Sequence, residues 1–423
     1  MKFREGTKMN EVETPILADK KKDLLYYKFM FAAYFLYMIS VAVKMCYTAE
    51  MVSMMGDFGV AKAEISKGLT VYYFIYAVGQ FLASFIIKRV NMKRLMSFSI
   101  LLSAVSFLLV PFADKLYYMW IILGVNGLCH AGIYGGCMHL FARHLPDRLS
   151  SSASKLVSTG VTVGTALAYG VSAFFVAVSS WRHTFLFFSL ISILSVVLFA
   201  YYEKKVEGLG EANVKTEEVG TIVVSEEKRK KVKTIIAFLL CSSILLSIIY
   251  YGISFWVPNL MKEVHQMPDA YSILITILVP LLAMPGPIVS VSLCKKRKNY
   301  FAICAIFAFL SLGITSILLF AYRTNIVVAL LLSSLSLFSI RGTLNLVSPY
   351  IPLLLKKEYD TGKLSCLTNS VLAVGAGVIP SLAGKIIDSY GWESYYMTFI
   401  LVTVVCFTVF LFVALYLKKT DKK

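Results

Sequence analysis

Long runs of apolar residues, interrupted by short charged or turn segments, constrain this chain more than any other feature. Each run reaches about 20 residues, the length of helix that crosses the hydrocarbon core of a bilayer. Only 16% of the residues are charged and the mean hydropathy is +0.73, whereas a soluble domain carries about 25% charged residues. The sequence therefore excludes a soluble enzyme and predicts an all-α polytopic membrane protein.

The pattern predicts twelve transmembrane helices in two six-helix halves. The expected spans are 26–54, 67–87, 95–113, 117–142, 152–178, 183–202, 234–261, 271–294, 300–321, 326–354, 364–387 and 394–417. Trp181 and Trp392 stand 211 residues apart, and the basic turns at Lys88 and Lys295 stand 207 apart. An internal repeat of this kind places a substrate site between the halves, near the middle of the membrane. The predicted organisation is a tail 1–25, a bundle 26–202, a linker 203–233, a bundle 234–417 and a tail 418–423.

The distribution of basic residues predicts the orientation of the chain. Of the 42 Lys and Arg, 33 fall on the side of the expected spans that carries the termini, seven on the other side and two within spans. This asymmetry predicts a multi-pass protein of the plasma membrane with both termini in the cytoplasm. All four Trp fall near the outer ends of spans, where their rings favour the headgroup layer. No folded domain offers a basic face, so the net charge of +18 does not indicate nucleic acid.

Several absences narrow the function further. The first 23 residues are polar and mixed in charge, so no cleavable signal peptide is expected. Residues 203–233 hold eight basic and seven acidic residues, which predicts a flexible linker. The eight Cys lie in apolar stretches without a Cys-x-x-Cys pair and are predicted to be small buried hydrophobes. We expect the protein to be a monomer without a metal, a cofactor or an enzyme activity.

Lys44 is a positive charge near the middle of the first span. Charge in the hydrocarbon core costs at least about 2.5–3.5 kcal/mol on insertion scales, so an intramembrane ion indicates function by default. Its neighbours along the helix face include Tyr37, Ser40 and Tyr47, as expected for the wall of a water-filled cavity. The alternative is a structural ion that pairs with Glu50 or a backbone carbonyl.

Arg341 in the tenth span and His130 in the fourth occupy equivalent places in the two halves, since 211 residues separate them. Neither Asp nor Glu lies in the span of Arg341 to neutralise it, while Asn345 and Ser348 share its face. His130 is a candidate for the site, although a lone membrane His also commonly bridges helices by hydrogen bonds.

Glu50 is the only acid well inside a span, so a central cavity would be net positive and would favour an anionic substrate. Further hydroxyl and amide groups can complete its lining or simply hold helices together. They are Tyr73, Tyr76 and Gln80 in span 2, Ser158, Thr162, Thr165 and Tyr169 in span 5, and Ser243, Ser247, Tyr250 and Ser254 in span 7. Pro and Gly at 284–287 and 375–380 indicate kinks, which help the halves rock or serve only as scaffold.

These features resemble the major facilitator superfamily over essentially the whole chain: twelve spans, a charged central linker, basic turns after spans 2 and 8, and Trp181-Arg182 opening span 6. Within it, the segment from Tyr251 to Val264 (YGISFWVPNLMKEV) is similar to the end of span 7 in the organophosphate:phosphate antiporters. Gly59 and Glu64, before span 2, fit the same resemblance. It implies a secondary transporter with alternating access.

The chain departs from the antiporter pattern at the residues that hold phosphate there. The resemblance implies two symmetric arginines, but Lys44 stands at the first position and Tyr250 at the second. Gln80 replaces a Lys in span 2 and Val161 replaces a His in span 5, while Lys88 stands where the superfamily's loop motif has Asp. Because Lys lacks the planar fork that grips phosphate, tight binding of a phosphate dianion is not expected.

We therefore expect a transporter for a small organic anion, a carboxylate or a phosphorylated metabolite, that works by exchange or uniport. The expected substrate-binding residues are Lys44, Arg341, His130, Tyr37, Tyr250, Asn345, Gln80 and Tyr76, and the coupling residues are His130 and Glu50. Two alternatives remain: a proton-coupled exporter that uses Glu50, and a membrane sensor with a carrier fold.

Overall fold

A computed structural model describes residues 15–86, 90–209, 226–296, 299–355 and 361–420, and these residues form helices and short connections without a strand. The N-terminal half consists of α1 (Pro15–Phe58), α2 (Lys62–Ile65), α3 (Lys67–Ile86), α4 (Met92–Leu108), η1 (Val110–Phe112), α5 (Leu116–His130), α6 (Ile133–His144), α7 (Asp147–Val178) and α8 (Trp181–Glu207). The C-terminal half consists of α9 (Glu226–His265), α10 (Asp269–Ile275), α11 (Leu278–Ala283), α12 (Gly286–Lys296), α13 (Tyr300–Ala321), α14 (Ile326–Asn345), η2 (Leu346–Tyr350), α15 (Ile351–Leu354) and α16 (Thr361–Thr420).

These elements give the twelve membrane crossings predicted from the sequence. Ten helices of the described residues are long and apolar enough to span a bilayer. One of them is α16, which contains two crossings because the chain reverses at Gly391, where φ is +76° and favours glycine. The remaining crossing is α3, whose 20 residues carry tyrosines and Gln80 among apolar side chains.

Large apolar side chains cover the outer surface of the helices. Phe112 and Phe320 are 80% and 81% exposed, and many Leu, Val and Phe side chains are similarly open. A water-soluble protein rarely exposes such a continuous apolar surface, whereas lipid covers it without cost. Cys241 is exposed and Cys366 is only partly buried, so the prediction that all eight Cys are buried was wrong for these two. An apolar residue in a bilayer need not be buried in protein.

The eighth crossing differs most from its predicted form. The expected single helix 271–294 is divided into α10, α11 and α12. Its amide groups at Ile277, Val279 and Met284 bond the carbonyl three residues back instead of four. Pro280, Pro285 and Pro287 lack the N–H group that a continuous helix needs, which explains the breaks.

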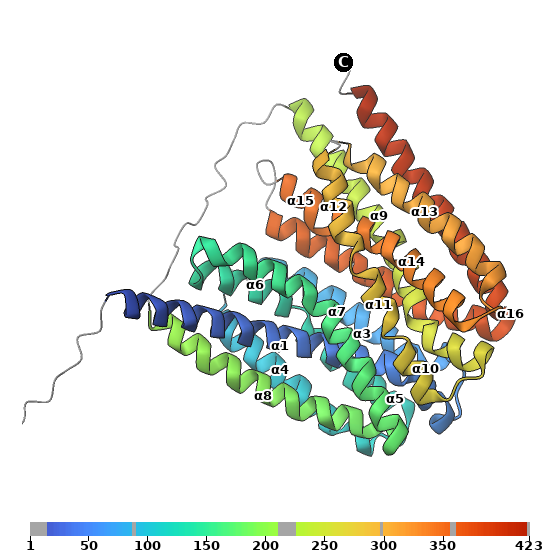
Figure 1. Ribbon diagram of the computed structural model, residues 1–423, viewed down its shortest axis with the longest axis horizontal. Helices are drawn as coiled ribbons and strands as arrows, with labels where there is room; N and C mark the ends of the chain where they lie inside the picture. The colour runs from blue at the N-terminus through green and yellow to red at the C-terminus, as the bar shows by residue number, and fades with distance from the viewer. Residues whose placement is uncertain (1–14, 87–89, 210–225, 297–298, 356–360, 421–423) are drawn as a thin grey trace, which may run out of the picture.

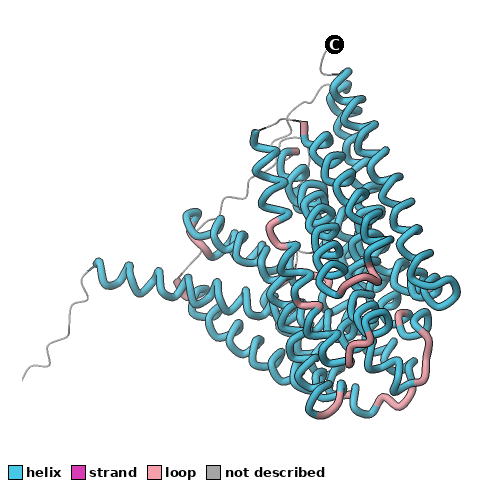
Figure 2. Tube along the Cα trace, turned by 45° about the vertical axis from the view of Figure 1, so that its right-hand side comes forward, coloured by secondary structure: helices cyan, strands magenta, loops and turns pink. Residues whose placement is uncertain are grey.

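The two halves converge on one side of the molecule and diverge on the other (Figure 1). The diverging side carries the start of α1, the end of α8, the start of α9 and the end of α16, and we call it the terminal side; the converging side is the distal side. Figure 2 shows the same arrangement from a second direction. Contacts between the halves run mainly from α3 to α16 and from α7 to α10.

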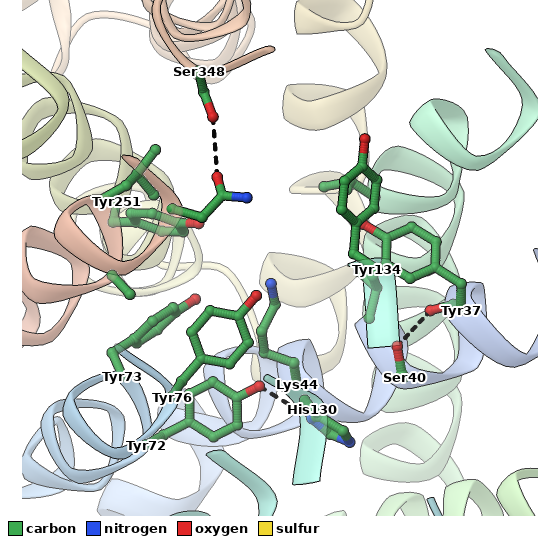
Figure 3. A pocket seen from close by; sticks show the side chains of 15 residues that line it. Tyr37, Ser40, Lys44, Tyr72, Tyr73, Tyr76, His130, Tyr134, Tyr251 and Ser348 are labelled. Atoms are coloured by element: carbon green, nitrogen blue, oxygen red, sulfur yellow. Dashed lines mark hydrogen bonds between the residues drawn. The ribbon is translucent and has the colours of Figure 1, made fainter. Parts of the chain in front are cut away.

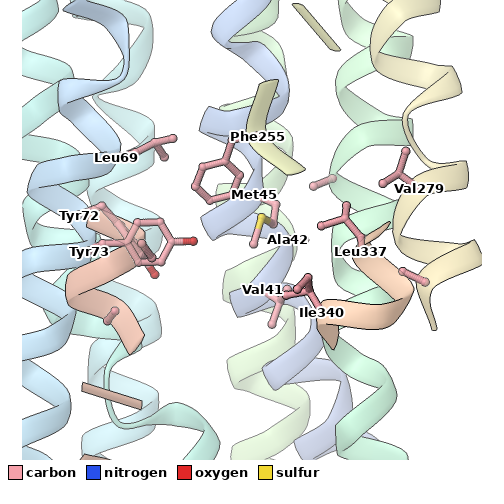
Figure 4. Packing of buried hydrophobic residues seen from close by; sticks show 14 of the residues in the cluster. Val41, Ala42, Met45, Leu69, Tyr72, Tyr73, Phe255, Val279, Leu337 and Ile340 are labelled. Carbon is pink, nitrogen blue, oxygen red and sulfur yellow. The ribbon is translucent and has the colours of Figure 1, made fainter. Parts of the chain in front are cut away.

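Buried apolar residues of both halves meet in one continuous core (Figure 4). Val41 and Met45 of α1 belong to it, together with Phe255 of α9 and Ile340 of α14. The middle of α1 therefore packs against both halves. This packing fixes the direction in which the remaining side chains of this part of α1 point.

The helices extend into the segment predicted to link the halves. α8 ends at Glu207 and α9 begins at Glu226, inside the expected range 203–233. The central part of that range, 210–225, lies outside the described residues, as do residues 1–14 and 421–423 of the two predicted tails.

Candidate functional site

A cavity of about 270 Å³ lies between the two halves, and it contains side chains that a purely structural core would not include (Figure 3). Its lining is Tyr37, Ser40, Val41, Lys44, Tyr72, Tyr73, Tyr76, His130, Tyr134 and Val161 from the N-terminal half, and Tyr251, Ser348, Asn369, Leu372 and Ala373 from the C-terminal half. The lining contains one Lys and one His but no Asp or Glu.

Lys44 carries the charge of this cavity. It projects from the middle of α1, and its amino group points toward the Tyr76 hydroxyl group in Figure 3. Among the described residues no carboxylate forms an ion pair with it, and the alternative pairing with Glu50 is not formed. An unpaired ammonium group in a cavity of low polarity attracts an anion more strongly than it would in water.

Six tyrosines surround this charge. Tyr72 and Tyr76 stack with ring centroids 6.0 Å apart, and Tyr73 lies 5.2 Å from Tyr251 of the other half. Across the cavity, the rings of Tyr37 and Tyr134 are 5.6 Å apart. Tyrosine offers both an apolar ring and a hydroxyl donor, so this wall suits a ligand with an apolar or aromatic body.

His130 is tied into a hydrogen-bond network at the N-terminal wall. Its Nδ1 lies 3.0 Å from the Tyr72 hydroxyl, and its Nε2 lies 3.1 Å from the Ser103 hydroxyl. Ser103 in turn donates to the Asn126 side chain, which also donates to Ser106. Both ring nitrogens of His130 therefore have protein partners, and the His links α3, α4 and α5.

Gln80 and Tyr76 form a second polar pair. Gln80 donates from Nε2 to the Tyr76 hydroxyl at 2.7 Å, although only Tyr76 reaches the cavity lining. Tyr250 stacks edge-on against Tyr251 at 5.0 Å, and Tyr251 rather than Tyr250 lines the cavity.

Arg341 lies outside the lining and connects the two halves instead. Its guanidinium donates to the Thr162 hydroxyl of α7 at 2.9 Å and to the Pro280 carbonyl of α11 at 3.3 Å. The helix break leaves the Pro280 carbonyl without its usual partner, since Met284 donates to Leu281. Arg341 thus caps the broken eighth crossing and holds it against the other half.

Glu50 is separate from the cavity. It is completely buried within the N-terminal half, and the Ser172 and Thr184 hydroxyl groups lie close to its carboxylate. Of the eight expected substrate residues, the structure thus gathers Lys44, His130, Tyr37 and Tyr76 around the cavity. Arg341, Tyr250, Asn345 and Gln80 are not part of its lining.

The sequence arguments missed Tyr72 and Asn369, both of which line the cavity. Asn369 accepts a hydrogen bond from Ser348 at 3.0 Å, and Ser348 lies in the π-helical turn η2. A π-helical turn shifts the register of the following residues, so the face shared by Arg341 and Asn345 does not continue to Ser348. The signal that could have identified Asn369 from the sequence is its amide side chain inside an otherwise apolar span.

The distal side is closed by charged and polar contacts between the halves. Lys62 of the N-terminal half pairs with Glu263 at 2.7 Å and with Asp388 at 3.3 Å. Trp392 donates to Glu263 at 3.0 Å, and the backbone of Ala63 donates to Asp388 at 3.0 Å. Within each half, further pairs fix the helix ends. They are Asp57–Arg182 at 2.5 Å and Lys262–Asp269 at 2.8 Å.

Residues 30–380 match the family model of the Major Facilitator Superfamily. No curated protein sequence matches the chain. Among solved structures, the bacterial homologue of the human lysosomal transporter Spinster has a TM-score of 0.69 at 12% identity, covering 93% of this chain and 96% of that one. The xylose transporter XylE from E. coli gives 0.68 at 11%, covering 91% and 98%, and the nucleoside transporter NupG gives 0.66 at 12%, covering 92% and 99%. These likenesses concern the fold.

Proposed function

Because this chain belongs to the major facilitator superfamily, we propose that it is a secondary transporter that carries a small organic anion by alternating access. One observation carries the proposal: Lys44 lines the central cavity with no ion pair to any described residue and no acid among the lining residues. A buried charge in a membrane protein is retained where it pairs or serves function. The partner that Lys44 lacks in the protein is supplied by the substrate.

The expected substrate is a monoanion with an apolar or aromatic body. A single ammonium group supplies one positive charge without the planar fork that grips phosphate. Arg341, the other intramembrane cation, already donates to Thr162 and Pro280. The tyrosine rings around Lys44 supply apolar contacts together with hydroxyl groups. A carboxylate therefore fits this cavity better than a phosphate dianion does.

The distribution of charge supports an orientation with both termini in the cytoplasm of a cell whose plasma membrane the protein spans. In this orientation the ion pairs of Lys62 close the external side, and the halves diverge toward the cytoplasm. Alternating access then requires that these pairs break and that the cytoplasmic ends approach each other.

Anion exchange or uniport is the mode that the cavity supports. A proton relay needs a group that can titrate in contact with the cavity, but both nitrogens of His130 are engaged and Glu50 is not part of the lining. Complete burial of Glu50 supports the other candidate, a proton-coupled exporter, which would have to connect this carboxylate to the cavity.

Ligand binding to the purified protein tests the proposal. Thermal unfolding in detergent is measured with acetate, benzoate, phosphate, glycerol phosphate and xylose, because a ligand that binds only the folded state raises the unfolding temperature. We expect benzoate to stabilise most and phosphate least. Lys44→Met should weaken the binding of the best carboxylate about tenfold to a hundredfold, the value of a charge-assisted hydrogen bond of about 1.5–3 kcal/mol.

Lys67→Met is the matched control, because Lys67 is exposed on the distal side and pairs with Glu64. Equal binding of a neutral sugar by the wild type and Lys44→Met would contradict the proposal. Counterflow in liposomes with and without a pH gradient then tests the mode. Accumulation that requires the gradient, and that Glu50→Gln abolishes while His130→Asn retains it, would establish the proton-coupled exporter.

A further inference from the structure

A second cavity opens on the outer surface of the N-terminal half, between α1 and α8. It has a volume of about 490 Å³. Most of its wall is formed by Leu24, Phe31 and Phe35 of α1 and by Leu198 and Tyr202 of α8. The one charged group in the lining is Lys28 of α1. We call this cavity the α1–α8 groove.

The groove opens to the surroundings of the protein and not to the central cavity. Leu24 and Phe31 are 53% and 54% exposed, and the two cavities share no lining residue. Both helices of the groove cross the membrane, so lipid lies against this surface. A hollow in such a surface leaves its wall without contacts unless a chain fills it. The occupant that suits the groove therefore enters sideways from the bilayer.

The groove has the depth of part of one leaflet. Lys28, Phe31 and Phe35 follow one face of α1, because residues three, four and seven positions apart share a face. Seven residues of helix rise about 10 Å, and one leaflet contributes about half of a hydrocarbon core of roughly 30 Å. Lys28 stands near the start of the first crossing. The apolar wall thus runs from the polar boundary of the membrane into its interior, as an acyl chain does.

Two ammonium groups stand at the polar end of the groove. Lys28 belongs to the lining, and the Lys205 amino group of α8 lies 4.4 Å from the centroid of the Tyr201 ring. Tyr201 also lies within electrostatic range of Lys28, so both charges flank the same end of the contact between α1 and α8. Both lysines are exposed, and in the part of the chain that the structure describes neither forms an ion pair.

The acids near this end are engaged elsewhere. Glu203 is buried and pairs with Lys93 of α4, and Glu207 pairs with the same lysine at 3.3 Å. Asp23 of α1 lies outside the groove lining and takes part in an interaction of its own. The end of the groove therefore has a positive charge that no acid of the lining cancels. An anionic headgroup complements this charge.

We propose that the α1–α8 groove binds one anionic phospholipid, with its phosphate between Lys28 and Lys205 and an acyl chain along Phe31. A soluble anion leaves the apolar wall empty, and a zwitterionic headgroup carries a cation of its own, which the lysines repel. Tyr27 and Tyr202 in the lining offer the amphipathic rings that favour the headgroup level. In the proposed orientation, with the terminal side in the cytoplasm, the groove faces the leaflet that carries anionic lipids.

The bound lipid joins α1 to α8, and both helices belong to the N-terminal half. The groove therefore keeps its shape when the halves rock, so the lipid stabilises the fold without favouring either opening. α1 is also the helix that presents Lys44 to the central cavity. Lipid binding goes beyond the proposed transport of an anion and can be measured without a substrate, so the failure of one proposal leaves the other standing.

Thermal unfolding of the full-length purified protein in detergent tests the site. Phosphatidylglycerol and phosphatidylcholine with identical acyl chains are titrated in parallel with soluble glycerol phosphate. We expect phosphatidylglycerol to raise the unfolding temperature by several degrees with saturation, and native mass spectrometry to find one retained lipid. Lys28→Gln and Lys205→Gln should each weaken phosphatidylglycerol binding about fivefold, which corresponds to about 1 kcal/mol per lysine, with little effect on phosphatidylcholine. Phe31→Ser should weaken the binding of both lipids.

The matched control combines Lys233→Gln and Lys296→Gln, which remove two exposed charges from the terminal ends of α9 and α12. This variant should keep the wild-type preference for phosphatidylglycerol. Equal stabilisation of the wild type by both lipids would overturn the proposal, and so would an equal loss of preference in the control. Stabilisation by glycerol phosphate that Lys28→Gln abolishes would show a site for soluble anions instead. Because the exchanged lysines are exposed, the variants are expected to fold.

Discussion

The two main interfaces between the halves are built in different ways. On one side, α16 packs before its reversal at Gly391 along the continuous helix α3 and the short preceding helix α2, and Gly384 lies against the backbone of Lys62 and Ala63 in α2. Hydroxyl groups join the helices, with Thr70 and Ser381 2.9 Å apart and Ser370 donating to the Ala77 carbonyl at 2.8 Å.

The second interface, between α7 and α10, is mostly apolar. α10 is the first segment of the broken eighth crossing. Tyr169 and Ala173 of α7 pack against Ile273 of α10, and beyond α10 the helix breaks at two further places. Arg341 of α14 adds a polar link to α7, through Thr162. A broken helix bends at low cost, whereas a continuous one moves as a unit. The comparison predicts that α3 and α16 stay together as the halves rock while α10 to α12 change shape.

The largest effect is expected from adding volume where α16 meets α2, at the distal end of the α3–α16 interface. In Gly384→Leu the new Cβ would lie 2.8–2.9 Å from backbone atoms of Lys62 and Ala63, which cannot rotate away. Overpacking costs about 1–3 kcal/mol, so the closed distal side should lose about tenfold to a hundredfold in population. Spin labels at the exposed positions Ala61 and Tyr390 would report this as a longer distance.

Gly313→Leu provides the control for this change, because a Cβ at Gly313 meets nothing within 4 Å. The label distance should stay at the wild-type value in that variant. An unchanged distance in Gly384→Leu as well would mean that the α3–α16 interface yields, and that the two interfaces do not differ as described.

An intermediate effect is expected from Arg341→Met at the other interface. The variant loses the bonds to Thr162 and Pro280. Hydrogen bonds between membrane helices are worth about 0.6 kcal/mol on average and about 1.7 kcal/mol at most, so the two together exceed the single neutral bond of Ser381. Hydrogen exchange in peptides covering α11 and α12 should rise, while exchange in α3 and α16 should not. Thr162→Val should give roughly half of the effect, and combining both changes should add little, because the two residues share one bond.

Arg323→Met is the control, since Arg323 is an exposed residue that contacts only the Tyr322 ring among the interactions described. Faster exchange throughout the C-terminal half in Arg341→Met would show that Arg341 supports the whole bundle and not specifically the broken crossing.

The smallest effect is expected from Ser381→Ala. It removes one hydroxyl contact with Thr70 but leaves the close approach of α16 to α2 intact. Hydrogen bonds between membrane helices average about 0.6 kcal/mol, so the unfolding temperature should fall by no more than about 2 °C. Ser316→Ala, where the hydroxyl bonds only its own helix, gives the baseline. A loss comparable to that of Gly384→Leu would mean that hydroxyl bonding, and not backbone proximity, holds this interface.

Most of the fold followed from the sequence because its cause is local. Apolar length alone specifies a membrane helix, and the twelve predicted crossings are confirmed. The breaks in the eighth crossing also have a local cause, the three prolines between 280 and 287, but the sequence does not say that a distant Arg341 caps the free carbonyl. Contacts of that kind depend on which helices become neighbours.

The candidate site was predictable to the extent that its residues break the apolar pattern. Lys44 and His130 stand out in this way, and both line the cavity. Tyr72 does not, because a tyrosine in a membrane helix is equally suited to the core. Whether Tyr72 or Tyr73 faces the cavity depends on the rotation of α3, which its contact with α16 sets, and in the structure both do.

The ion pairs of Lys62 make the closed distal side sensitive to the salt concentration of the medium outside it. Lys62 and its partners Glu263 and Asp388 retain 14%, 34% and 24% of their side-chain exposure, so dissolved ions reach them. At physiological ionic strength the screening length is about 8 Å, and it falls to about 3 Å at 1 M salt. Concentrated salt on that face weakens the attraction that keeps it shut. The equilibrium between states with the distal side closed and states with it open is thereby linked to the salt concentration of the compartment that the distal side faces, whatever the identity of the dissolved ions.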